Sequence, residues 1–304
     1  ESILSVRLGK IKLANPVIAC SGTFNFGAEY SQFYDVSMLG AVVTKSYSLR
    51  PRQGNPPPRT CETPCGILNS IGLQNDGIDK FIKKHLPQAE KLKINLILSI
   101  SGEDAEEFGK VASEAARVKD RIAAVELNLS CPNVKKGGAT FSESPDEVKK
   151  IVKSVCRILK IPVIAKLSPN QRNTAEAAAA AKKGGAEAVS LINTVVGMAV
   201  DIETFRPKLG NVLGGLSGPA IKPIALAKIY RLAREDILPI IGMGGVFNWK
   251  DAVEFMLAGA SAVGIGTVNF IQYDAGKRII EGLKNYAEGR GIKNIGGITG
   301  RLKV

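Results

Sequence analysis

Eight short apolar segments recur through the chain after residue 16, each followed by a polar or glycine-containing break and then by a stretch with helical spacing. The segments span residues 17–20, 41–44, 95–100, 123–129, 162–167, 188–193, 238–242 and 262–266. Strands that are apolar on both faces are typical of parallel sheets covered by helices on both sides. Eight such units in about 250 residues predict an α/β fold, a closed (β/α)₈ or TIM barrel, rather than an open sheet.

The stretches between the apolar segments have the periodicity and the caps of helices. The clearest, residues 103–118, has an apolar stripe along one face and acidic residues in its first turn. Ser144 and Pro145 suit the cap and the first position of a helix over 145–159. Further helices are predicted over 174–183, 219–234 and 249–258, and a short N-terminal hairpin over 4–13. No linker or shift in composition interrupts this pattern, so residues 1–304 are expected to form one domain.

Composition excludes several classes of protein. The apolar fraction of 45% is ample for a core, and no apolar run approaches the ~20 residues of a membrane-spanning helix. The first residues lack the basic and apolar regions of a signal peptide. The five cysteines are odd in number and scattered, which indicates reduced thiols and a cytoplasmic location. They are Cys20, Cys61, Cys65, Cys131 and Cys156.

Two further partner classes are weighed against simpler explanations. Cys61 and Cys65 have the spacing of one half of a zinc site, but no second pair follows and His85 is the sole histidine. Two cysteines in a structured loop are therefore expected, with no metal. The net charge of +13 indicates an anionic partner, either nucleic acid or a phosphate ligand. Because the basic residues are spread along helices and aromatic content is only 6%, a solvated basic surface is favoured over nucleic acid.

Polar residues and glycines follow the predicted strands, where the active sites of such barrels lie. In chain order they are Ser21 and Gly22, Lys45 and Ser46, Ser99, Asn128 with Cys131, Lys166, Asn193 and Thr194, Gly244 and Gly245, and Gly266 and Thr267. The glycine-rich ends of the last two strands predict a phosphate grip through bare backbone N–H groups, with tight turns as the alternative. The set contains no carboxylate pair and no Ser-His-Asp combination.

Two lysines and a thiol carry the chemical interest. Lys45 and Lys166 end apolar strands, where a charge needs an anionic partner or a function. Since Glu126 and Asn128 share a face of one strand, Glu126 is hypothesised to reach Lys166 inside the barrel. Cys131 can act as a base or nucleophile if its pKa is lowered, although free cysteines are more often packing residues.

Two irregular segments are expected to serve the site. The Gly-rich stretch after Cys131, with Lys135, Lys136, Gly137 and Gly138, is typical of a lid over an active site. Residues 47–76 form the longest irregular region, rich in Pro and Gly, and a loop of that length is usually functional.

Seven ordered motifs resemble those of one enzyme family. They are TKSYSLRPRQGNPPPR, GILNSIGLQNDG, NLSCPNVKKGGATF, AKLSPN, GGLSGPAIKP, IIGMGGV and ASAVGIGT. Together they resemble class 1 dihydroorotate dehydrogenases, and within them class 1B, over residues 17 to about 270. The resemblance implies an FMN-binding barrel that oxidises dihydroorotate to orotate in pyrimidine (UMP) biosynthesis. Cys131 would take the C5 proton while a hydride passes from C6 to flavin N5; class 2 enzymes have serine there.

The resemblance also assigns binding residues. The FMN phosphate would lie on Gly244, Gly245, Gly266 and Thr267, with Gly218 nearby. The flavin ring and ribityl chain would contact Ser21, Lys45, Ser46, Asn128, Lys166 and Ile192, with Lys166 stabilising the charge of reduced flavin. Orotate would be held by Asn69, by the backbone of Ser70, Ile71, Gly72 and Leu73, and by Asn193 and Thr194, while Asn128 and Lys45 touch both ligands.

Two features depart from the family, and the assembly follows from the class. Ser99 stands where the class commonly has asparagine, which puts that flavin contact in question, and Cys61 and Cys65 match no family role. Class 1B implies a partner subunit that carries FAD and a 2Fe-2S cluster and passes electrons to NAD, around a homodimer within a heterotetramer. No cluster-spaced cysteines occur in this chain.

Three rival functions remain open at this point. They are a class 1A homodimer that uses fumarate, a flavin-dependent tRNA-dihydrouridine synthase, and a barrel that binds a phosphate ligand without catalysis. The tRNA enzyme would need a helical RNA-binding domain after the barrel, and only about 40 residues follow the eighth strand.

Overall fold

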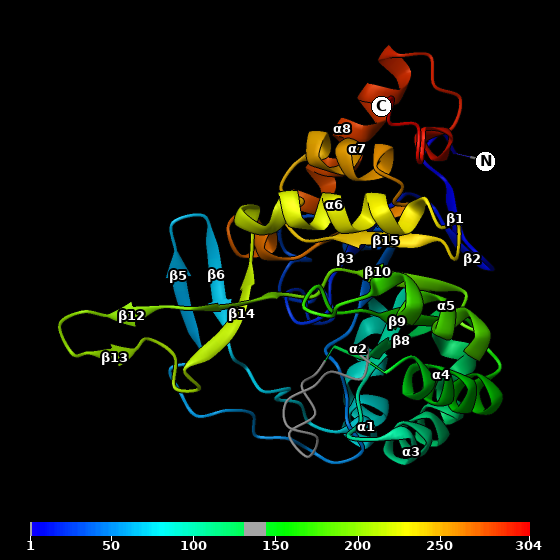
Figure 1. Ribbon diagram of the computed structural model, residues 1–304. Coiled ribbons are helices and arrows are strands. Elements are labelled where there is room, and N and C mark those ends of the chain that lie inside the picture. The colour runs from blue at the N-terminus through cyan, green and yellow to red at the C-terminus, as the bar shows by residue number, and fades with distance from the viewer. Residues whose placement is uncertain (1, 131–143) are drawn as a thin grey trace.

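A closed barrel of eight parallel strands forms the centre of the computed structural model, which describes residues 2–130 and 144–304 (Figure 1). The strands are β3 (Val17–Ala19), β4 (Ala41–Val43), β7 (Leu96–Ile100), β8 (Ala124–Asn128), β9 (Val163–Lys166), β10 (Ala188–Leu191), β15 (Ile240–Met243) and β16 (Ala262–Ile265). Each pairs with the next in chain order, and β16 pairs with β3 to close the ring. Their residues are buried throughout, as expected for a parallel sheet covered by helices. The predicted (β/α)₈ barrel is confirmed.

Helices cover the outside of the barrel and mostly begin where the sequence places a cap. The longer ones are α3 (Ala105–Ala115), α4 (Pro145–Leu159), α5 (Thr174–Gly184), α6 (Lys222–Ala233), α7 (Trp249–Leu257) and α8 (Ala275–Gly289). The Ser144 side chain accepts a hydrogen bond from the Glu147 N–H, and Asn248 and Asp251 form a capping box before α7. The expected 103–118 helix ends at Ala115, because Val118 leaves helical geometry in the 3₁₀ turn η3 (Ala116–Arg121).

Shorter helical pieces complete the outer layer, and several lie where no helix was predicted. They are η1 (Val36–Met38), α1 (Ile78–Lys80), the π-helical η2 (Phe81–His85), α2 (Leu86–Lys91), η6 (Pro219–Ile221), η7 (Thr267–Phe270) and η8 (Ile295–Ile298). The segment 78–91 and helix α8 were both missed. The expected N-terminal hairpin is present as β1 (Val6–Leu8) and β2 (Ile11–Leu13), with buried apolar residues alternating with exposed ones.

A second, four-stranded antiparallel sheet lies beside the barrel, in the order β11-β14-β6-β5 (Figure 1). Its strands are β5 (Thr60–Thr63), β6 (Gly66–Asn69), β11 (Val195–Met198) and β14 (Leu213–Ser217), and a small ribbon of β12 (Val200–Asp201) and β13 (Arg206–Pro207) projects beyond it. The expectation that residues 47–76 are wholly irregular was wrong. The central pairing joins segments 150 residues apart, which local patterns do not reveal.

Candidate functional site

A continuous line of side-chain hydrogen bonds crosses the carboxyl ends of four barrel strands. The Ser99 and Ser46 hydroxyls share a bond of 2.8 Å, and Asn128 Nδ2 donates to Ser46 Oγ at 3.2 Å. Ser130 Oγ donates to Asn128 Oδ1 at 3.0 Å and accepts from Asn193 Nδ2 at 2.6 Å. Parallel strands bring these ends to one rim, so four residues predicted from different segments meet here.

Ser99 keeps a polar role but takes a neighbouring side chain as its partner. Its side chain is fully buried, and its hydroxyl lies against Ser46, while its backbone N–H donates to Thr44 Oγ1. The shorter serine therefore acts through Ser46 in the rim. A direct contact between Ser99 and a cofactor stays a prediction.

Ser130 is a residue that the sequence reasoning missed. It fixes two amides at once: its donated bond orients Asn128, and its accepted bond orients Asn193. Asn193 Oδ1 then accepts from the backbone N–H of Thr194. Ser130 lies in the turn directly after β8, two positions from the predicted Asn128, and this place at a strand end was the available signal.

Lys166 and Glu126 form a buried ion pair inside the barrel mouth. Lys166 Nζ lies 3.8 Å from Glu126 Oε1, and the side chains are 8% and 1% exposed. Glu126 Oε2 accepts from Ser190 Oγ at 2.8 Å. The hypothesis that Glu126 reaches Lys166 is confirmed.

A second lysine, Lys45, shares this mouth. Burial lowers the pKa of Lys45 below its ordinary value, and the positive charge of Lys166 lowers it further. An ideal Cβ at Gly22 would lie 3.9 Å from Lys45 Nζ, so Lys45 reaches the end of β3, beside Ser21. Two lysines and one carboxylate at this mouth leave a net positive charge, which suits an anionic ligand.

The glycines predicted to hold a phosphate gather at the ends of β14, β15 and β16. The φ angles of +115° at Gly244 and +96° at Gly245 explain glycine there by backbone conformation alone. At Gly266 an added Cβ would meet nothing closer than 3.8 Å, so the backbone there is open to the approach of a ligand.

The surroundings of Gly266 fit an anion. Among the described residues, the backbone N–H groups of Gly244, Gly245, Gly266 and Thr267 have no hydrogen-bond acceptor. Thr267 Oγ1 donates to Ser217 Oγ at 2.9 Å, and a Cβ at Gly218 would lie 3.7 Å from Thr267 Cγ2. Ile192 lies next to Gly244, since a Cβ added at Gly244 would lie 3.0 Å from the Ile192 side chain. All the predicted phosphate residues therefore share one region.

The predicted substrate residues lie where the second sheet meets the rim. Asn69 Nδ2 donates to the Gly215 carbonyl at 3.3 Å, and the Thr194 side chain lies directly against Gly215, where a Cβ would collide with it. Asn69 and Thr194 thus meet across one glycine of β14. The Asn193 amide adjoins them through the Thr194 N–H.

The loop over residues 70–73 is tied in place by its backbone. The Ser70 N–H donates to the Arg59 carbonyl, while Asn55 donates to the carbonyls of Ser70 and Ile71. Gly72 and Leu73 both have positive φ, +72° and +56°. The buried Ser70 hydroxyl has no partner in the described part of the chain, as a group awaiting a ligand would.

Two cysteine predictions have different outcomes. Cys131 and the expected lid at Lys135–Gly138 lie outside the described residues. Cys61 is in β5 opposite Leu68, and Cys65 is exposed just before β6.

The Cys20 thiol is buried beside the Lys166–Glu126 pair. Burial raises the pKa of Cys20 to about 12; the charge of Lys166 opposes this rise and that of Glu126 adds to it, so the thiol stays protonated.

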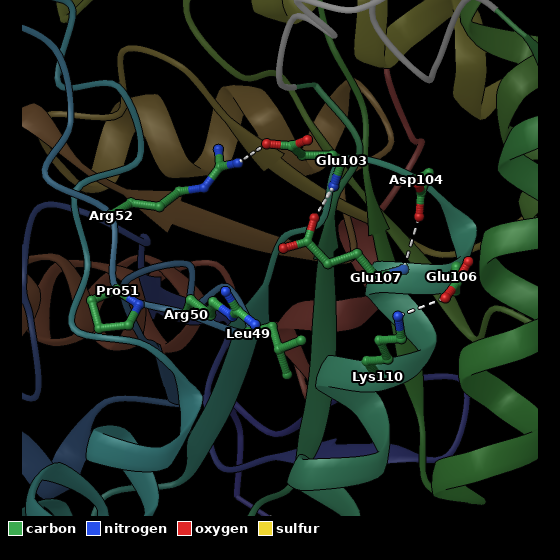
Figure 2. A pocket seen from close by; sticks show the side chains of 9 residues that line it. All are labelled: Leu49, Arg50, Pro51, Arg52, Glu103, Asp104, Glu106, Glu107 and Lys110. Atoms are coloured by element: carbon green, nitrogen blue, oxygen red, sulfur yellow. Dashed lines mark hydrogen bonds and ion pairs between the residues drawn. The ribbon is translucent and has the colours of Figure 1, made fainter.

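A separate cleft of about 410 Å³ lies at the start of α3 (Figure 2). It is lined by Leu49, Arg50, Pro51, Arg52, Glu103, Asp104, Glu106, Glu107 and Lys110. Its charges pair largely among themselves: Arg52 with Glu103, and Lys110 with Glu106 at 2.6 Å. None of the predicted site residues lines this cleft, so the strand-end rim is the candidate site.

Comparison with known proteins points to one family. The family model described as dihydroorotate dehydrogenase matches residues 3–286. A protein of Thermoanaerobacter sp. (strain X514) named dihydroorotate dehydrogenase B (NAD(+)), catalytic subunit, is 50% identical over 301 residues, 99% of each chain. Proteins of the same name from Bacteroides thetaiotaomicron (47% over 301 residues, 99% of each chain) and Desulforamulus reducens (48% over 297 residues, 98% of this chain and 97% of the relative) are similar.

Proposed function

Because the chain belongs to the dihydroorotate dehydrogenase family, we propose that it is the catalytic subunit that oxidises dihydroorotate to orotate in pyrimidine biosynthesis, with NAD as the final acceptor. The relatives match it from end to end and carry the NAD(+) subunit name, which disfavours the fumarate-dependent, tRNA-modifying and non-catalytic alternatives. The observation that carries the proposal is the rim, where buried lysines, oriented amides and free backbone N–H groups converge.

The residues at the rim fit FMN. We assign the phosphate to the free N–H groups of Gly244, Gly245, Gly266 and Thr267, beside Gly218. Bound FMN supplies the acceptor for the two electrons of the oxidation. Lys166 offers a preorganised positive charge to the anionic side of the ring, and Ser21, Lys45, Ser46, Asn128 and Ile192 are assigned to the ring and ribityl chain, with Ser99 acting through Ser46.

The second sheet and its loop supply the substrate half of the site. Asn69, Asn128 and Asn193 each present an amide, which matches the donor–acceptor edges of a cyclic diamide. Thr194 and the backbone of residues 70–73 complete this set, and Lys45 supplies charge for the carboxylate of the substrate. Ser130 keeps two of the amides in fixed orientation before the substrate arrives.

Cys131 is the proposed base for the C5 proton. It follows Ser130, which contacts both Asn128 and Asn193. The positively charged mouth favours a thiolate, since a nearby cation lowers the pKa of a thiol. A base placed at the substrate lets proton removal accompany hydride loss.

The subunit name of the relatives implies a partner, and we propose its nature. An electron-transfer subunit with FAD and a 2Fe-2S cluster would receive electrons from this chain and reduce NAD, around a homodimer of this chain within a heterotetramer. We propose that the assembly is cytoplasmic and that residues 1–304 act as one domain. Within the described residues no helix is both long and apolar enough to span a membrane.

The absorption spectrum of the purified chain tests the proposal. A yellow protein whose visible flavin bands bleach on addition of dihydroorotate without oxygen is expected. A chain purified with FMN that dihydroorotate leaves unbleached would contradict the substrate. Turnover with fumarate by the chain alone would instead favour the class 1A alternative.

A further inference from the structure

Glu126 is a buried carboxylate to which neither the binding nor the proton-transfer assignments above give a role. Its side chain is 1% exposed and lies on β8, two residues before the rim residue Asn128. A carboxylate so deep in a barrel is unfavourable unless it is paired and hydrogen-bonded. The site therefore has a use for the negative charge of Glu126 as a counter-charge.

The two carboxylate oxygens of Glu126 make different contacts. Oε2 accepts from Ser190 Oγ on β10 at 2.8 Å, which fixes the carboxylate. Oε1 has no hydrogen-bond partner among the described residues and lies 3.8 Å from Lys166 Nζ. That distance gives charge attraction but is too long for a hydrogen bond.

The N–H donors of Lys166 are consequently left unused. Lys166 Nζ donates to no acceptor in residues 2–130 or 144–304, although the side chain is only 8% exposed. A carboxylate within hydrogen-bond distance would also occupy one of these donors. At 3.8 Å the carboxylate supplies charge alone.

We propose that Glu126 is a positioning residue that holds Lys166 in its charged form while leaving all of its N–H donors to an anionic ligand. This inference rests on the proposed function, in which that ligand is FMN. Ser190 acts with Glu126 by fixing the carboxylate at this distance. Without Glu126, the buried Lys166 would lie near Lys45 with no counter-charge among the described residues.

Three titratable groups among the described residues face Lys166 and must be separated in a test. Glu126 comes from β8, Lys45 follows β4, and Cys20 follows β3. Burial raises the pKa of Cys20 to about 12, above the useful range. The pKa of Lys45 is lowered by burial and by Lys166, so Lys45 contributes a pH dependence to every variant. The informative quantity is therefore the difference between variants.

The experiment measures FMN affinity of the flavin-free full chain by fluorescence quenching, from about pH 7 to about pH 9.5, where an ordinary lysine stays charged. Glu126→Gln keeps the shape and removes the charge, whereas Glu126→Asp keeps the charge and shortens the side chain. Glu114→Gln, an exposed glutamate of α3, is the matched control. The double variant Glu126→Gln with Lys166→Met removes the titrating lysine.

Relative to wild type, Glu126→Gln should lose FMN affinity by about tenfold or more as the pH rises, because the unpaired Lys166 gives up its proton. Glu126→Asp should follow the wild-type pH profile, and the double variant should lack the additional step. A Glu126→Gln profile parallel to wild type would overturn the role of Glu126. A role in packing alone predicts that Asp is more damaging than Gln.

Folding and the cofactor assignment are tested separately. If Glu126→Gln does not fold, Ser190→Ala keeps both charges but frees the carboxylate, and should show a smaller pH-dependent loss in the same direction. An unchanged profile for a folded Ser190→Ala would then count against the inference. A wild-type chain that binds no FMN would overturn both the cofactor and this role, whereas FMN binding without bleaching would overturn the substrate alone.

Discussion

The two halves of the site are built from different kinds of structure. The half assigned to the cofactor stands on barrel strands, where Glu126 of β8, Lys166 of β9 and Ser190 of β10 are buried and in contact. The half assigned to the substrate stands on the second sheet, where Asn69 and Thr194 are half-buried and meet across Gly215. Asn128, Ser130 and Asn193 join the two halves by side-chain hydrogen bonds, and Thr267 also joins them by its bond to Ser217 of β14.

This difference suggests a division of labour. A barrel rim is held by paired strands on both sides and makes a rigid platform for a resident group. A sheet made from two long excursions of the chain can vary without disturbing the barrel, as loops that carry specificity usually do. Substitutions in one half should therefore leave the other half working.

The largest effect is expected for Cys131→Ala. Loss of the base should slow reduction of the flavin by dihydroorotate by roughly 10²–10⁴-fold at neutral pH. FMN should be retained, because the cofactor half is unchanged. Anaerobic stopped-flow bleaching measures the rate, with Cys156→Ala on α4 as the control. Undiminished bleaching in Cys131→Ala would rule out this residue as the base.

The contrast between the halves also explains what the sequence could predict. Barrel strands such as β8 and β9 are buried on both faces, so a continuous apolar run marks them locally. The ends of those runs predicted that Lys45, Asn128 and Lys166 lie at the carboxyl ends of barrel strands, and the structure has them there. The pairing of Glu126 with Lys166 followed from two-residue alternation alone.

The strands of the substrate half could not be predicted from local apolar runs, for a physical reason. Strands β6 and β14 each carry glycine and few buried positions, and they pair with each other although they lie 150 residues apart in the chain. The stacking of His85 on Phe26 likewise joins segment 78–91 to the loop after β3 through a tertiary contact. Such partners cannot be read from a local pattern.

Lys166→Met should impair the cofactor half of the site and leave the substrate half intact. Removing the buried cation should weaken FMN binding by roughly tenfold to a hundredfold, the usual range for a charge-assisted hydrogen bond. The KM for dihydroorotate in fully loaded enzyme should change little. Equilibrium titration with FMN and steady-state kinetics measure both, with the exposed Lys284→Met as the control. A raised KM with normal FMN affinity would reverse the assignment of Lys166.

Gly215→Ala should impair the substrate half of the site and leave the cofactor half intact. The new Cβ would collide with the Thr194 side chain and displace it from Asn69. We expect the KM for dihydroorotate to rise by about tenfold with unchanged FMN affinity, since a small misplacement of binding groups is costly. Gly297→Ala is the control, because its Cβ would meet nothing within 4 Å. Loss of FMN from Gly215→Ala would show that the halves are coupled.

The smallest expected effect concerns Lys45, which lies between the halves and is assigned to both ligands. Burial and then the charge of Lys166 lower its pKa in the folded chain below the ordinary 10.5. At a pH between the lowered pKa of folded Lys45 and the ordinary pKa of unfolded Lys45, the folded state therefore binds fewer protons than the unfolded state. The stability of the fold rises with pH across that window. Below the window the charged Lys45 destabilises the folded chain fully.

Lys45→Met should accordingly stabilise the flavin-free chain by about 1 kcal/mol at neutral pH, as replacement of strained functional residues often does. The gain should shrink as the pH rises toward the ordinary lysine pKa, because wild-type Lys45 then becomes neutral. Urea unfolding at about pH 7 and about pH 10 measures the difference, with Lys284→Met as the exposed control. A gain that grows with pH would mean that Lys45 is stabilised in its charged form, and the rim would then contain a counter-charge besides Glu126.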